Sequence, residues 1–317
     1  MNNKRIIMIH GLASKPPKAD VERLWRKCIV ESIKVDRPDF FDGVDDAAFN
    51  DIFRMVYWAN DIPSHLEDEP AYVTRLDAAV DAVIKERREK KDGFHVGLGD
   101  RFEAFVKDVA IDAVYTLTTA LTVKDDVAKG ILEEVRLYSE DQYIADKVRN
   151  SLEDELRDAW DNNKEVVLIS HSMGTFISYD VLWRFSHRNT EGYKKFRNKK
   201  VKFFITMGSP LGENVVQDIL FAKRYKKEGK RSYPNNIDNW HNYACLGDVV
   251  AHDSTLKDDF FKEMHKLKIL PRENARDYEK LYNPFKKPTD NKQNPHKSYG
   301  YLVQPKLSKW LIEFLNV

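Results

Sequence analysis

The chain has little cysteine and no long apolar run. Its two cysteines, Cys28 and Cys245, are too few for a framework of disulfides, and their spacing is not that of metal ligands. The apolar run at residues 6–9 is too short for the core of a signal peptide. No run approaches the roughly 18 apolar residues of a membrane span. These absences lead us to expect a cytoplasmic protein without a structural metal.

Charge of one sign is also lacking, since 52 Lys and Arg residues are balanced by 51 Asp and Glu residues. Positive charge nevertheless gathers in two short runs, Lys194–Lys202 and Lys223–Arg231. Such runs can attract an anionic membrane surface or a nucleic acid. Solvated loops are the simpler interpretation. Peripheral contact with an anionic membrane is therefore an open alternative, and we do not expect a nucleic-acid partner.

Short apolar runs that end at small or polar residues predict the strands of a parallel sheet. Three are clear, Arg5–Ile9, Glu165–Ile169 and Val201–Met207, and two more are plausible, Ile52–Trp58 and Trp240–Leu246. Helical patterns follow several of these runs, at residues 21–33, 176–185 and 305–317. This alternation predicts an α/β protein with a doubly wound, mostly parallel sheet.

The segment from residue 66 to residue 150 interrupts the alternation. It has helical patterns throughout, with an apolar stripe from Phe102 to Leu121. An insertion of this length between two strands is more often a helical cap or an elaborated crossover than a linker. We expect a core made of residues 1–65 and 151–317, with residues 66–150 as a helical cap. The alternative is that the stripe packs on the back of the sheet.

The strongest motif is Ser-His-Ser-Met-Gly at residues 170–174, which lies between a predicted buried strand and a helix. The nucleophile elbow, Gly-x-Ser-x-Gly, occupies this same context. Its turn is so tight that the residues two before and two after the nucleophile must be small. Gly174 meets this condition, and Ser170 stands in place of the other glycine. The motif predicts Ser172 as a nucleophile, with a plain helix-capping serine as the alternative.

An oxyanion formed by a serine nucleophile needs hydrogen-bond donors. The first predicted strand ends in His10-Gly11-Leu12. Here the sequence resembles the lipase and esterase branch of the α/β-hydrolase fold, in which a strand followed by His-Gly-x supplies the first donor. The resemblance implies that the backbone N–H groups of Leu12 and Met173 form the oxyanion hole. It also implies that Gly11 lets the backbone approach the reacting carbonyl and that His10 holds the loop.

The predicted strand at residues 201–207 ends in Gly-Ser-Pro-Leu-Gly. This segment is similar to the strand after the nucleophile helix in lipases of the glycosylphosphatidylinositol-deacylase and lecithin-acyltransferase type. The resemblance implies that Ser209, Pro210 and Leu211 line the substrate pocket, to which we add Gly11 and His171 as candidates. An ordinary Gly/Pro turn is the alternative.

In this fold the acid follows the nucleophile and precedes the histidine in the chain. Asp248 comes directly after the predicted strand at residues 240–246, in a Gly-Asp-x-Val segment that resembles the family pattern. Asp253 is the main rival, five residues later. Asp238 precedes the strand and fits less well. We predict Asp248 as the supporting acid.

For the base, His296-Lys-Ser-Tyr resembles the His-x-Ser-Tyr segment that carries the histidine in these lipases, ahead of a final helix. The other eight of the nine histidines lie too early in the chain, in the insertion, beside the nucleophile or on helices. The resemblance covers residues 4–58 and 160–317. One departure is that no strand is recognisable between Ala251 and Pro295, where residues 256–270 have a helical pattern and residues 283–295 that of a loop.

These motifs together predict a serine hydrolase that cleaves a carboxylic ester, with lipid acyl esters included, through an acyl-enzyme. Neither a metal nor a cofactor is implied. Thioester hydrolysis or acyl transfer to an alcohol would use the same residues. A non-catalytic binding protein of the same fold is the alternative from another class, because a fold does not guarantee a function.

Overall fold

The computed structural model describes residues 1, 3–11, 16–60, 70–94 and 136–316. These residues form a six-stranded sheet with the order β2-β1-β3-β4-β5-β6, and all neighbouring strands are parallel. The strands are β1 (Lys4–Ile9), β2 (Phe53–Val56), β3 (Glu165–His171), β4 (Val201–Met207), β5 (Ile237–Cys245) and β6 (Ala275–Leu281). The predicted α/β class with a doubly wound parallel sheet is confirmed.

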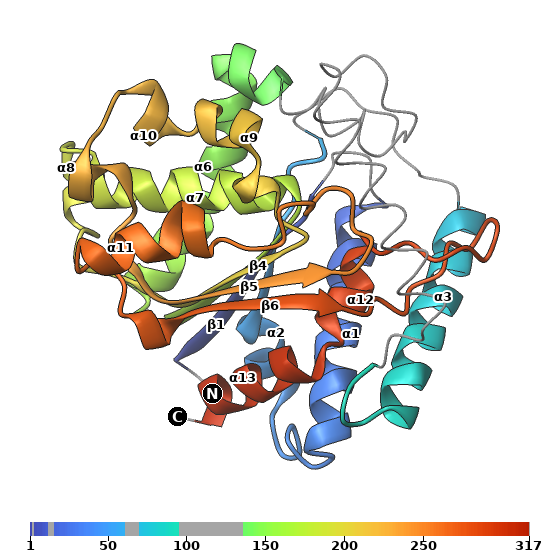
Figure 1. Ribbon diagram of the computed structural model, residues 1–317. Helices are drawn as coiled ribbons and strands as arrows, with labels where there is room; N and C mark the ends of the chain where they lie inside the picture. Colours follow the sequence, from blue (N-terminus) through green and yellow to red (C-terminus); the bar gives the residue numbers. More distant parts are fainter. Residues whose placement is uncertain (2, 12–15, 61–69, 95–135, 317) are drawn as a thin grey trace, which may run out of the picture.

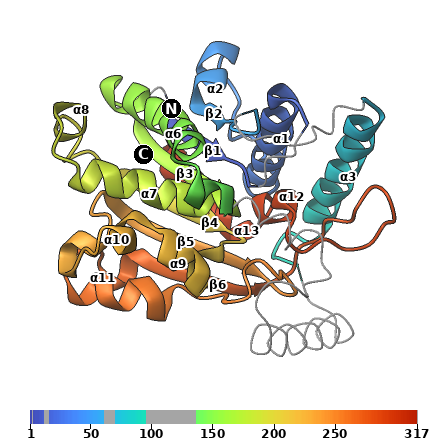
Figure 2. The same ribbon diagram turned by 90° about the horizontal axis from the view of Figure 1, so that it is seen from above.

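Helices cover both faces of the sheet (Figures 1 and 2). Alternate residues of β1 enter two separate cores, with Ile7 and Ile9 on one face and Ile6 and Met8 on the other. On the first face lie α6 (Gln142–Asp161) and α7 (Met173–His187). On the second lie α1 (Lys18–Asp36), α3 (Pro70–Glu89), α12 (Ser298–Leu302) and α13 (Pro305–Asn316).

Shorter helices complete the described chain, and most of them lie in the connections. They are α2 (Asp46–Ile52), α8 (Glu191–Lys194), α9 (Asn214–Ile219), α10 (Phe221–Arg224) and α11 (Lys262–Lys266). A π-helical turn, Lys257–Phe261, leads into α11. The helix predicted over residues 256–270 is thus shorter, since it spans residues 257–266 and its first turn is π-helical.

Strand β6 corrects the expectation that no strand lies between Ala251 and Pro295. Its sequence, Ala-Arg-Asp-Tyr-Glu-Lys-Leu, carries four charged residues and pairs only with β5 at the edge of the sheet. None of its side chains is buried. An edge strand in contact with solvent needs no apolar run, and its charges oppose pairing with other chains.

Parts of the predicted insertion belong to the helical layers. Leu76 and Val80 of α3 share a core with Leu24 and Cys28 of α1. The two helices lie side by side in both views (Figures 1 and 2). Helix α6 starts at Gln142, so the boundary drawn at residue 150 falls inside it. The stripe from residue 102 to residue 121 lies outside the described residues, and the cap stays a prediction.

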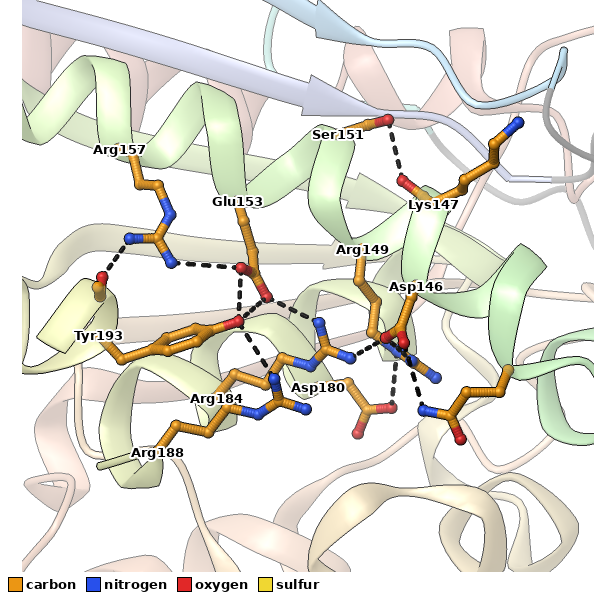
Figure 3. Close-up of polar contacts among 12 residues, drawn as sticks. Asp146, Lys147, Arg149, Ser151, Glu153, Arg157, Asp180, Arg184, Arg188 and Tyr193 are labelled. Carbon is orange, nitrogen blue, oxygen red and sulfur yellow. Dashed lines mark hydrogen bonds and ion pairs between the residues drawn. The ribbon is translucent and has the colours of Figure 1, made fainter. Parts of the chain in front are cut away.

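Helices α6 and α7 are joined by ion pairs around two buried arginines (Figure 3). Arg184 of α7 donates to Glu153 at 3.0 Å and also contacts Asp146, both on α6. Arg149 of α6 is 3.0 Å from Asp146 and 3.9 Å from Asp180 of α7. Both arginines are almost fully buried. Each buried cation therefore has a carboxylate partner. The pairs hold α7 in place, and the candidate site lies at the start of this helix.

Candidate active site

Ser172 occupies a strained turn between β3 and α7. Its backbone has φ 54° and ψ −127°, a combination that residues other than glycine rarely adopt. The Ser172 N–H donates to the Met207 carbonyl at 3.0 Å, and the Thr175 hydroxyl donates to the Ser172 carbonyl at 2.7 Å. These bonds hold the turn in a conformation that the chain alone would avoid.

Gly174 allows α7 to begin directly against the end of β1. A Cβ at this position would lie 2.8 Å from the His10 carbonyl oxygen and 2.9 Å from that of Ile9. Gly174 is therefore required by its close contact with the end of β1. Ser170 fits because its hydroxyl hydrogen-bonds with the Ser178 hydroxyl at 2.8 Å, within the buried interface of β3 and α7.

The structure brings Ser172, His296 and Asp248 together. The His296 Nε2 atom lies 3.0 Å from the Ser172 Oγ atom, and Nδ1 lies 2.9 and 3.0 Å from the two carboxylate oxygens of Asp248. An ionised carboxylate only accepts hydrogen bonds, so Nδ1 carries a proton. In the neutral ring Nε2 is then left to accept the hydroxyl proton of Ser172. Ser172, Asp248 and His296 are all buried residues.

Asp248 receives further hydrogen bonds in its buried position. The Val250 N–H donates to Oδ1 at 3.0 Å, and the Tyr301 hydroxyl donates to Oδ2 at 2.5 Å. Burial raises the pKa of Asp248, but the charge of His296 and the hydrogen bonds from His296 and Tyr301 outweigh it. The pKa of Asp248 therefore lies below its ordinary value, and the carboxylate stays ionised.

Sequence reasoning missed Tyr301. Its hydroxyl also accepts a hydrogen bond from the Cys245 N–H at 2.9 Å, so it links the end of β5 to Asp248. Burial and the charge of Asp248 raise the pKa of Tyr301 well above its ordinary value, which keeps the hydroxyl protonated as a donor. A tyrosine on a short C-terminal helix gives no signal that distinguishes it from a core residue.

The two rival acids lie elsewhere. Asp253 packs against Gly212, where a Cβ would lie 2.8 Å from the Asp253 Cβ, and its carboxylate accepts from the Thr255 N–H at 3.2 Å. Asp238, near the start of β5, pairs with Lys200 at 3.2 Å. Both contacts made by the Nδ1 atom of His296 are to Asp248.

The predicted oxyanion residues are only partly within the described chain. Met173 is the first residue of α7, and its N–H is among those that a helix start leaves without an intrahelical partner. Gly11 lies over the nucleophile, since a Cβ there would be 2.5 Å from the Ser172 Cβ and 3.1 Å from its Oγ. Leu12 lies outside the described residues. The oxyanion roles stay predictions.

His10 has a fixed ring beside this loop. Its Nδ1 donates to the Gly11 carbonyl at 2.8 Å, and its Nε2 accepts from the Trp58 N–H at 3.1 Å. The ring stacks on that of Trp58 with 4.8 Å between centroids. This arrangement requires the neutral ring with its proton on Nδ1, so His10 supports the end of β1 and has no proton-accepting nitrogen to spare.

The residues predicted to line the pocket are buried near the nucleophile. The Ser209 hydroxyl donates to the Thr175 hydroxyl at 2.9 Å and accepts from the Leu211 N–H at 3.2 Å. Pro210 opens the 3₁₀ turn that contains Leu211. His171 lies behind His296, with 4.7 Å between ring centroids. A pocket role for these residues and for Gly11 stays a prediction.

Gly208 was not singled out for the site by the sequence. Its φ is 53°, and a Cβ would lie 2.9 Å from an Asp248 carboxylate oxygen and 3.1 Å from the His296 Nδ1 atom. Only glycine lets the end of β4 pass so close to this pair.

No cluster of His, Cys, Asp or Glu within the described chain could hold a metal ion. Of the helices that the structure describes, none is both long and apolar enough to cross a membrane.

Residues 136–228 match the family model of lecithin:cholesterol acyltransferase, over a stretch that includes α6, the Ser172 turn, α7 and β4 but neither Asp248 nor His296. No curated protein and no solved structure shows a significant match. The glycosylphosphatidylinositol-deacylase resemblance stays a prediction. Over residues 136–228 the chain is similar to an acyltransferase and lipase-like family of the α/β-hydrolase class, and its sheet has the corresponding fold.

Proposed function

We propose that this protein is a serine hydrolase that cleaves carboxylic esters, with Ser172 as nucleophile, His296 as general base and Asp248 as supporting acid. The observation that carries the proposal is the continuous chain of hydrogen bonds from the Ser172 hydroxyl through His296 to Asp248. Its three members come from three connections at the carboxyl edge of the sheet, where ligands bind in such folds.

The reaction follows from this geometry. His296 Nε2 takes the proton of the Ser172 hydroxyl as Oγ attacks the acyl carbon. The N–H group of Met173 stabilises the oxyanion, together with that of Leu12 as the family resemblance implies. The ester C–O bond then breaks, and His296 returns the proton to the departing alcohol. Water, activated by the same imidazole, releases the acyl group from Ser172. Asp248 orients the ring and stabilises its charged form throughout.

The family match supports a lipid acyl ester as the substrate, because the matched family is named for an acyltransferase that acts on lecithin and cholesterol. In acyl transfer an alcohol replaces water in the second half of the reaction, and the same residues would serve. A purely binding role gives no reason for the strained backbone of Ser172, which costs about 1–3 kcal/mol of stability.

A fluorophosphonate probe followed by intact-mass measurement tests the proposal. We expect the wild-type protein to gain one phosphonyl group and to hydrolyse a short p-nitrophenyl ester. Ser172→Ala should abolish both. Ser170→Ala is the matched control, because it removes a buried hydroxyl two residues away whose hydrogen bond is to Ser178 and not to the proposed triad. Labelling that survives Ser172→Ala, or a wild-type protein that is neither labelled nor active, would contradict the proposal.

A further inference from the structure

Three consecutive carbonyl groups around His296 each accept a hydrogen bond from a buried side chain. The Asn283 Nδ2 atom donates to the Pro295 oxygen at 2.7 Å and to the Lys297 oxygen at 2.9 Å. His171 Nε2 donates to the carbonyl of His296 itself at 2.7 Å. Hydrogen bonds therefore hold the main chain before His296, after His296 and at the carbonyl of His296 itself.

Asn283 is itself fixed. It is fully buried, its Oδ1 accepts from the Phe285 N–H at 3.0 Å, and its own carbonyl accepts from Gln293 Nε2 at 2.8 Å. Because the carbonyls of Pro295 and Lys297 can only accept, the NH₂ group must face them and the oxygen must face Phe285. The orientation of the amide is thus determined by its partners.

Gly300 leaves the space that Asn283 occupies. A Cβ at Gly300 would lie 1.6 Å from Asn283 Oδ1 and 2.3 Å from its Cγ, so any other residue would displace the amide. The φ of Gly300 is not in the left-handed region, and its backbone alone would accept alanine. The glycine is required here by the side chain that it faces.

We propose that Asn283 and His171 are positioning residues that hold the imidazole of His296 within hydrogen-bonding distance of Ser172. The inference rests on the proposed function, because it concerns the same base. His296 follows a Pro-, Asn- and Lys-rich loop, and its side chain cannot keep its place if the main chain moves. A general base must lie about 2.6–3.2 Å from the proton it takes, and a displacement of about 1 Å can lower the rate roughly 10²-fold.

The first test compares Asn283→Ala with the wild type, with the rate constant of fluorophosphonate labelling, kcat and KM as readouts. We expect labelling and kcat to fall together by roughly 10²-fold, with KM unchanged. Asn283→Asp should behave like Asn283→Ala, since a carboxylate cannot donate to the two carbonyls. Asn242→Ala is the matched control, because Asn242 is equally buried and also makes three side-chain hydrogen bonds, none of them to residues 295–297. It should lose stability and keep the wild-type labelling rate.

The second test uses Gly300→Ala, which displaces the Asn283 amide while Asn283, His171 and His296 themselves stay unchanged. We expect the same loss as in Asn283→Ala, and no further loss in the double variant, because both changes remove one interaction. Losses that multiply would show that the two positions act independently and would overturn the role of Gly300.

Two variants of His171 keep the proposal testable if Asn283→Ala fails to fold. His171→Gln retains an N–H donor and should keep more of the labelling rate than His171→Ala. Equal rates in the folded His171 variants, or wild-type labelling in folded Asn283→Ala, would overturn the positioning role. A wild-type protein without labelling at Ser172 would instead contradict the proposed function, so the two failures are distinguishable.

Discussion

At the scale of single residues, the site depends on how one carboxylate is held. Asp248 is buried, yet its pKa is lowered because His296, Tyr301 and the Val250 N–H surround it with donors. A buried carboxylate that stays ionised can keep a proton on the Nδ1 atom of His296 and so leave Nε2 free to act as a base. Substitution of this single residue is therefore the most direct test of its role as the supporting acid.

Asp248→Asn should lower kcat by roughly 10²–10⁴-fold while the protein stays folded. An amide NH₂ facing Nδ1 would favour the ring form with its proton on Nε2, which cannot accept the Ser172 proton. Asp253→Asn is the control, since Asp253 is bonded to the Thr255 N–H and lies against Gly212. Steady-state ester hydrolysis measures both. Our assignment is wrong if Asp253→Asn loses activity and Asp248→Asn keeps it.

At the scale of elements, the buried network in Figure 3 joins α6 and α7 through groups that titrate. Asp180 of α7 accepts from the Tyr138 hydroxyl at 3.0 Å and from the Phe221 N–H at 3.0 Å, so it also fixes the start of α10. Burial raises the pKa of Asp180 to about 6, although the charge of Arg149 acts in the opposite direction. In its charged form this aspartate therefore opposes folding.

This raised pKa predicts a pH-dependent effect of Asp180→Asn. Between about pH 4 and pH 6 the folded protein holds a proton on Asp180 more tightly than the unfolded chain, so this group makes the free energy of unfolding fall as pH rises through that window. The variant lacks this contribution. The free energy of unfolding of the variant, relative to that of the wild type, should therefore rise by about 2 kcal/mol from pH 4.5 to pH 7. Urea unfolding at the two pH values measures this difference.

Asp277 has a pKa raised to about 6 as well, mainly by burial, but it titrates in both proteins and cancels in the comparison. A stability difference between wild type and Asp180→Asn that is the same at both pH values would contradict the prediction.

At the scale of the whole molecule, the two basic runs differ in how many of their cations have acidic partners. In the run Lys194–Lys202, Lys195 pairs with Asp161, and Lys200 and Lys202 both lie within 3.8 Å of Asp238. In the run Lys223–Arg231, only Lys223 has an acidic partner among the described residues, and Tyr225 is 49% exposed. Cations without an acidic partner in the described chain, adjacent in sequence to an exposed aromatic residue, suit an anionic lipid surface better than paired cations.

Sedimentation with vesicles of phosphatidylcholine and phosphatidylserine tests this difference. Replacing Arg224, Lys226 and Lys230 by glutamine should weaken binding by roughly 10²-fold, since each cation near such a surface contributes about 1 kcal/mol. The same replacement of Lys195, Lys200 and Lys202 removes equal charge and should have a smaller effect. Binding by the wild type should also weaken as salt is raised. Equal losses in both triple variants would mean that only net charge matters.

The sequence alone determined the features that are local in the chain. Apolar runs such as residues 5–9 and 165–169 predict buried strands because both faces of a central parallel strand are covered. The Ser-His-Ser-Met-Gly segment predicts the turn at Ser172, since a tight connection from strand to helix tolerates few residues. For the strands and for the turn, the physical constraint acts within a few neighbouring residues. His296 was predicted differently, from the resemblance of the His-Lys-Ser-Tyr segment to that of the lipases.

Which distant groups meet depends on the tertiary structure. It places Asp248 beside His296 and keeps Asp253 against Gly212, although both aspartates follow the same strand. Tyr301 and Asn283 also escaped prediction, because their partners lie far along the chain or across a loop whose path the sequence does not specify. Strand β6 escaped because an exposed edge needs no apolar run. Hydrogen bonds act over about 3 Å, and the spacing of residues along a chain does not determine distances on that scale.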